Sequence, residues 1–112
     1  MRVLNIRWVG VSTDDLDATR AFFESVLGLR VRFEEPGTVE LVTAEDDRVQ
    51  LFAGRSGAPV PLFEVDDVRA ARRELEAAGI ELVGSVERDT DWEYFAFRAP
   101  DGNLYELASR RL

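Results

Sequence analysis

The feature that most constrains the fold is an internal repeat, because the second half of the sequence presents its predicted elements in the order of the first. Residues 3–11 alternate in the manner of a β-strand, and residues 60–65 read as a strand in the second half. Polar residues then offer helix N-caps, a run of apolar residues follows at helical spacing, and a glycine closes the helix. The N-cap candidates are Ser12, Thr13, Asp14 and Asp15 in the first half and Asp66 and Asp67 in the second, and the closing glycines are Gly28 and Gly79.

Each predicted helix is followed by three strand candidates. They cover residues 30–34, 39–43, 48–53, 81–87, 93–98 and 104–108. The chain therefore reads as two βαβββ units, over residues 1–54 and 60–112, joined by a linker over 55–59. The expected fold class is α+β, with one domain in which each unit is a curved mixed sheet carrying one helix on its outer face.

One helix can cover only one face of a sheet, so the inner face of each unit needs another cover. It can close against the other unit or enclose a cavity for a ligand. The short linker allows the units to pair within one chain or to exchange between two chains, and the sequence leaves both arrangements open.

The composition excludes several classes of function. The chain has 112 residues with no cysteine and no histidine, so a thiolate zinc site, a cysteine nucleophile and an imidazole ligand are all unavailable. A net charge of -8, spread along the chain, argues against nucleic acid as a partner and favours cationic ligands. No apolar run approaches the roughly 20 residues that a membrane span requires. We expect a soluble cytoplasmic protein that has neither nucleic acid nor a membrane as a partner.

Three segments carry a resemblance to a known family: "FFESVLGL", "FEVDDVRAARRELEAAGIE" and "YFAFRAPDGNLYEL". Together with the tandem βαβββ order, they resemble the vicinal oxygen chelate superfamily of glyoxalases, bleomycin resistance proteins and extradiol dioxygenases. The resemblance covers essentially the whole chain. It implies a homodimer and a cavity on the inner sheet faces, while function within this superfamily varies widely.

Metal-using members of that superfamily place ligands on the first and last strands of each unit. Carried over by position, these sites fall on Trp8, Gln50, Val60 (or Pro61 if the strand shifts by one residue) and Glu106. Only Glu106 is a competent ligand, and Gln50 adds at best a weak carbonyl contact to a hydrated magnesium or calcium ion. We therefore expect no metal, no other cofactor and no catalytic residue. The alternative is a divalent metal bound by Glu106 with Gln50.

Six residues are candidates for binding a small molecule, three from each half. They are Trp8, Gln50, Phe52, Trp92, Tyr94 and Glu106. Strand alternation supports the set, because Gln50 and Phe52 share one face of their strand while Leu51 faces the helix.

Each of these residues also has a purely structural interpretation. Trp8 can fill the core, Gln50 can face water, and Trp92 with Tyr94 can belong to a dimer interface. Glu106 can form a hydrogen bond with Arg98 or Gln50 that satisfies a buried polar group.

The function favoured by the sequence is metal-free binding of a small molecule in a cavity between the units. Bleomycin resistance proteins resemble this arrangement, which suggests a homodimer that sequesters an aromatic or cationic compound without turnover. One alternative is a divergent metal-dependent lyase, isomerase or dioxygenase of the same superfamily that uses Glu106. A module that only mediates protein interactions is another.

Overall fold

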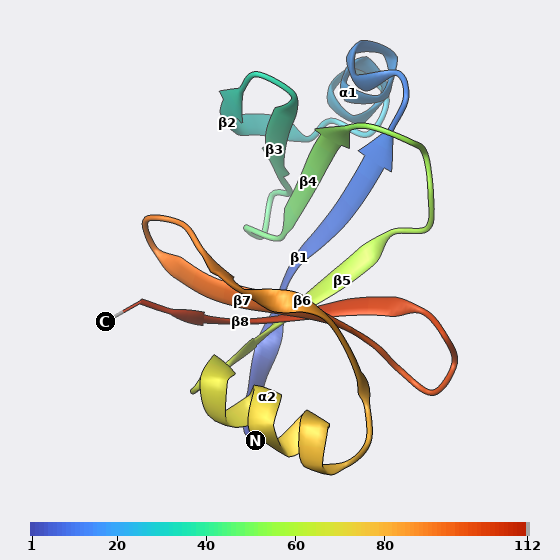
Figure 1. The fold of residues 1–112 in the computed structure, drawn as a ribbon. Coiled ribbons are helices and arrows are strands. Elements are labelled where there is room, and N and C mark those ends of the chain that lie inside the picture. The colour runs from blue at the N-terminus through green and yellow to red at the C-terminus, as the bar shows by residue number, and fades with distance from the viewer. Residues whose placement is uncertain (112) are drawn as a thin grey trace. The chain divides into compact units, whose positions relative to one another are not determined.

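The computed structural model describes residues 1–111 and contains eight strands and two helices in the order βαβββ–βαβββ (Figure 1). This order confirms the expected α+β fold class. The elements are β1 (Val3–Thr13), α1 (Leu16–Ser25), β2 (Arg30–Glu35), β3 (Thr38–Val42), β4 (Arg48–Ala53), β5 (Val60–Val65), α2 (Val68–Ala77), β6 (Glu81–Arg88), β7 (Trp92–Arg98) and β8 (Leu104–Arg110).

Two compact units divide the chain. One is Arg7–Val60, and the other combines Met1–Ile6 with the described residues from Pro61 onward. The first residues of β1 join the second unit through the backbone, since the Arg2 carbonyl accepts a hydrogen bond from the Asp66 amide at 3.4 Å.

In the Arg7–Val60 unit the strand order is β2-β3-β4-β1, with β1 parallel to β4 and the other pairs antiparallel. Helix α1 begins after Asp15, whose side chain accepts a hydrogen bond from the Ala18 amide at 3.0 Å. After the helix ends, Gly28 adopts a φ of 74°, which a residue with a side chain rarely adopts. Apolar residues of α1 pack on a buried core of Val39, Leu41 and Leu51.

In the other unit the strand order is β5-β8-β7-β6, and β5 is parallel to β8. Helix α2 begins after Asp67, whose carboxylate accepts hydrogen bonds from the amides of Arg69 and Ala70, both at 3.1 Å. The core of this unit lies between the sheet and α2. Its buried residues are Val65, Val68, Ala71, Phe95 and Leu107.

Strand alternation separates the two faces of each sheet. Leu51 is fully buried in the core that α1 covers, so its neighbours Gln50 and Phe52 lie on the opposite, inner face. Leu107 belongs to the core under α2 in the same way, and Glu106 therefore lies on the inner face of its unit. The assignment of Gln50 and Phe52 to the face opposite Leu51, made from the sequence, is therefore correct.

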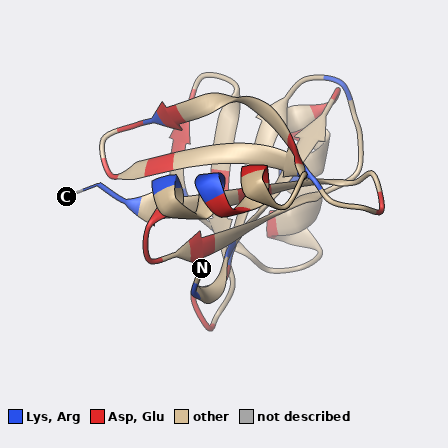
Figure 2. Cartoon of the chain, turned by 60° about the horizontal axis from the view of Figure 1, so that its bottom comes forward, with Lys and Arg blue, Asp and Glu red and all other residues tan. Residues whose placement is uncertain are grey.

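Acidic and basic residues are interspersed along the elements, and no helix or strand is basic throughout (Figure 2). None of the helices in residues 1–111 has the length and apolar character needed to cross a membrane.

Candidate functional site

On the inner face of the Arg7–Val60 unit, one row of paired residues crosses all four strands and carries two polar side chains in its middle. Pairing in the sheet aligns Gly10 with Gln50, Gln50 with Glu40, and Glu40 with Phe33. Residues that are directly paired point to the same side of a sheet, so this row lies on one surface. Glu40 in its middle is 4% exposed, which is unusual for a carboxylate.

The carboxylate of Glu40 is the centre of a hydrogen-bond network. Its Oε1 accepts hydrogen bonds from the indole nitrogen of Trp8 at 2.6 Å and from the amide nitrogen of Gln50 at 3.1 Å. Its Oε2 accepts a hydrogen bond from Arg32 at 2.8 Å and lies 3.5 Å from a guanidinium nitrogen of Arg48. Burial alone would raise the pKa of Glu40, but these donors and the charge of Arg48 outweigh burial and hold that pKa below its ordinary value. Glu40 is therefore ionised at neutral pH.

Two of the six candidates from the sequence, Trp8 and Gln50, are thus held together by Glu40, a residue that the sequence analysis missed. A third, Phe52, is 36% exposed beside them, and a Cβ placed on Gly10 would lie 3.6 Å from its ring. The signal for Glu40 was present in "TVELV", where one acid interrupts an apolar strand at the parity of the inner face.

The other three candidates lie on the inner face of the other unit. Tyr94 is paired with Glu87 and with Ala108, while Glu106 is paired with Ala96. Trp92 lies on the same face, and the guanidinium of Arg110 stands over its ring at 4.5 Å from the centroid.

The half-buried side chain of Glu106 has no hydrogen bond or ion pair within the described residues of its own unit. The interpretation that it only satisfies Arg98 is wrong, because Arg98 pairs with Glu81 and donates to the Gly102 carbonyl. A hydrogen bond with Gln50, which belongs to the other unit, stays a prediction. Burial raises the pKa of Glu106, and the nearby charge of Glu87 raises it further. The pKa of Tyr94 is also raised, first by burial and then by the surrounding carboxylates. This face therefore holds negative charge that its own side chains do not neutralise.

The metal site implied by the family resemblance does not fit these residues. Trp8 offers only an N–H donor, and Gln50 can contribute no more than its amide oxygen. Glu106 is the one carboxylate at the equivalent positions, whereas catalytic divalent ions take about three protein ligands. Across residues 1–111, no group of three or more His, Cys, Asp or Glu side chains is placed to hold a metal ion.

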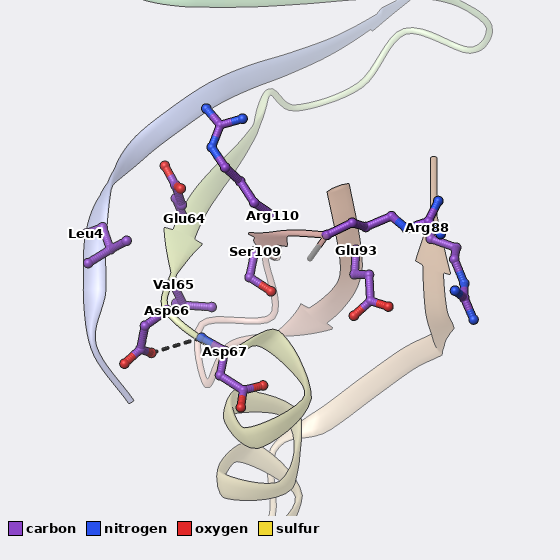
Figure 3. A pocket seen from close by; sticks show the side chains of 10 residues that line it. Leu4, Glu64, Val65, Asp66, Asp67, Arg88, Glu93, Ser109 and Arg110 are labelled. Carbon is purple, nitrogen blue, oxygen red and sulfur yellow. Dashed lines mark hydrogen bonds between the residues drawn. The ribbon is translucent and has the colours of Figure 1, made fainter. Parts of the chain in front are cut away.

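A separate pocket of about 460 Å³ opens beside the start of α2 (Figure 3). Its lining is Leu4, Glu64, Val65, Asp66, Asp67, Arg88, Glu93, Ser109, Arg110 and Arg111, so none of the six candidates contributes to it. Most of the charged and polar groups that line this pocket already have structural partners. Asp67 caps α2, Glu93 pairs with Arg69, and Ser109 accepts a hydrogen bond from the first amide of the helix.

Two βαβββ units with these inner faces define the class of protein. The chain belongs to the Glyoxalase/Bleomycin resistance protein/Dioxygenase superfamily, since the sequence model of that family matches residues 5–107. This confirms the resemblance found in the sequence. No curated protein shows significant sequence similarity to the chain.

Solved structures agree with this assignment. The chain is 30% identical to a Mn(II)-bound glyoxalase from Novosphingobium aromaticivorans, with a TM-score of 0.74, over 96% of this chain and 39% of that one. It is 23% identical to methylmalonyl-CoA epimerase from Mycobacterium tuberculosis, with a TM-score of 0.77 and coverage of 98% and 90%. A superfamily member from Vibrio splendidus 12B01 is 19% identical, with a TM-score of 0.76 and coverage of 96% and 99%. The similarity to the epimerase and to the Vibrio protein concerns the fold alone.

Proposed function

We propose that this protein binds a small organic cation with an aromatic body, without metal and without turnover, on the inner face around Glu106. The observation that carries the proposal is the half-buried carboxylate of Glu106, which has no partner within the described residues of its own unit and whose pKa is raised by burial and by Glu87. Sequestration of a drug-like compound is the physiological role that this binding would serve.

A cationic ligand supplies what this face lacks. An ionised carboxylate that has lost part of its hydration is destabilised until an opposite charge or a donor compensates it. The ring of Tyr94 on the same face offers a surface on which a cation or an aromatic ring can stack, whereas Trp92 is buried and its ring lies under the Arg110 guanidinium. The net charge of -8 also attracts cations to the protein before they bind.

A metal-dependent enzyme that uses Glu106 is the competing hypothesis, and the 30% identity to a Mn(II)-bound glyoxalase favours it. The two hypotheses differ in what neutralises Glu106, and metal analysis of the purified protein separates them. A stoichiometric divalent metal that disappears in the Glu106→Ala variant would refute our proposal.

The direct test is thermal unfolding of the protein with benzyltrimethylammonium, a permanently charged aromatic cation, and with benzyl alcohol as its uncharged counterpart. At a concentration about a hundredfold above the dissociation constant, the cation should stabilise the fold by ~2.7 kcal/mol. Glu106→Gln should abolish the effect, and Glu76→Gln on α2 is the matched control that should preserve it. Equal stabilisation of wild type and Glu106→Gln, or none of the wild type, contradicts the proposal.

The pH dependence of binding gives a second criterion. Because the pKa of Glu106 is raised, its proton competes with the cation at a higher pH than an ordinary glutamate would allow. Affinity for benzyltrimethylammonium should therefore fall as the pH is lowered through that pKa, although the ligand itself does not titrate.

A further inference from the structure

A β-bulge on the inner face of the Arg7–Val60 unit aims an arginine at the buried carboxylate. The register between β2 and β3 shifts between Val31 and Phe33, so Arg32 and Phe33 together lie opposite Glu40. In a regular strand two consecutive residues point to opposite faces, whereas a bulge can turn both towards one. Here Arg32 reaches across the inner face to Glu40 and Phe33 keeps its place in the row.

The head of Arg32 is held in place and is still accessible. One of its terminal nitrogens donates to Glu40 at 2.8 Å, and the side chain is 51% exposed. Its remaining N–H groups have no partner within residues 1–111. Trp8 and Gln50 hold Glu40 from its other side, so the Arg32 guanidinium contacts a carboxylate whose second oxygen is already hydrogen-bonded.

The charges of this cluster balance. Arg48, whose side chain is 12% exposed, also approaches Glu40, so two guanidinium groups share one buried carboxylate. Asp46, which is 74% exposed, pairs with Arg48 and supplies the second negative charge. What the cluster offers an anionic ligand is therefore the exposed donors of Arg32 and not an excess of positive charge.

We propose that the inner face of the Arg7–Val60 unit is a binding site for a monocarboxylate with an aromatic body, in which Arg32 binds the carboxylate. A guanidinium fork matches the two oxygens of a carboxylate, and the free donors of Arg32 provide such a fork. A monocarboxylate brings a single negative charge to this fork, whereas a phosphate dianion would bring two into a protein that is already acidic. Glu40, Trp8 and Gln50 are positioning residues.

Two exposed aromatic side chains provide the surface for the body of the ligand. Phe33 is 50% exposed, next to Arg32, and Phe52 is 36% exposed, two residues beyond Gln50 on the same face. Glycine at position 10 adds no side chain beside the Phe52 ring. This site differs from the one around Glu106 in both its residues and the charge of its ligand, so the two proposals stand or fall separately.

Benzoate is the probe for this site, and the indole N–H of Trp8 is the reporter because it donates to Glu40. In a ¹⁵N NMR titration, we expect a saturable shift of the Trp8 indole resonance with a dissociation constant of about 1–10 mM, the range of a single charged contact on a small ligand. The chain has two tryptophans, and Trp92→Phe identifies the Trp8 signal.

Arg32→Gln should weaken benzoate binding at least tenfold, because the variant loses the charged guanidinium fork. Arg73→Gln, an exposed arginine of α2 in the other unit, is the matched control and should leave affinity unchanged, as should Glu106→Gln. Phenylphosphate and benzyl alcohol should bind more weakly than benzoate. The absence of a saturable shift, equal loss in both arginine variants, or tighter binding of phenylphosphate would each overturn the proposal.

Discussion

Replacing Glu40 by glutamine tests whether the buried network is organised around a negative charge. The substitution keeps the size of the side chain and one acceptor oxygen. It removes the charge that faces Arg32 and Arg48, and it places an amide N–H₂ among groups that are all donors.

The expected cost is large because Glu40 is 4% exposed and its partner Arg48 is also largely buried. Removing one member of a buried ion pair typically destabilises a protein by about 3–5 kcal/mol, since the remaining charge stays buried without compensation. We expect Glu40→Gln to lower the free energy of unfolding by ~3 kcal/mol, the lower end of this range, because glutamine can still accept one hydrogen bond. For a domain of this size the melting temperature should fall by roughly 12 °C.

Urea unfolding followed by tryptophan fluorescence measures the effect, and Glu35→Gln is the matched control. Glu35 is exposed on β2 and forms no hydrogen bond or ion pair within residues 1–111, so its substitution should change stability by less than about 0.5 kcal/mol.

The charge of Glu40 also makes the stability of the protein depend on pH. The pKa of Glu40 in the folded protein lies below its ordinary value of 4.5. Its stabilising contribution is therefore complete above pH 4.5 and is lost as the pH falls through the folded-state pKa. The difference between wild type and Glu40→Gln should shrink over that acidic range. A Glu40→Gln protein as stable as wild type at neutral pH, or a difference that persists unchanged into strong acid, would refute this account of the network.

Three further predictions concern other parts of the molecule. Glu106 has a pKa above its ordinary value of 4.5, so the wild type should lose stability as the pH rises through that pKa, and urea unfolding should find Glu106→Gln more stable at neutral pH and equal to wild type in acid. Asp67→Ala removes the N-cap of α2 and should cost about 1 kcal/mol by chemical denaturation, whereas Asp67→Asn should cost much less. A homodimer stays a prediction from the family likeness, and light scattering of the purified protein should give twice the mass of the 12.6 kDa chain.

The order and type of the elements could be predicted from the sequence because their signals are local. Asp15 and Asp67 cap helices through contacts within three residues, and glycine is needed where the backbone reverses. Alternation along a strand is equally local, which is why the sequence predicted that Gln50 and Phe52 share one face of their strand. Strand ends were less exact, since β1 runs on to Thr13, where β4 pairs with it.

The sequence by itself therefore determined the repeat, the fold class, the family and the shared sheet face of Gln50 and Phe52. The tertiary structure alone decided which side chains meet on those faces. Trp8 reaches Glu40 across 32 positions of the chain, and Arg32 reaches it through a bulge that shifts the register by one residue. Periodicity carries no information about the register between distant strands. The hydrogen-bond network around Glu40 and the lack of a partner for Glu106 in its own unit could therefore not be predicted before the strands were paired.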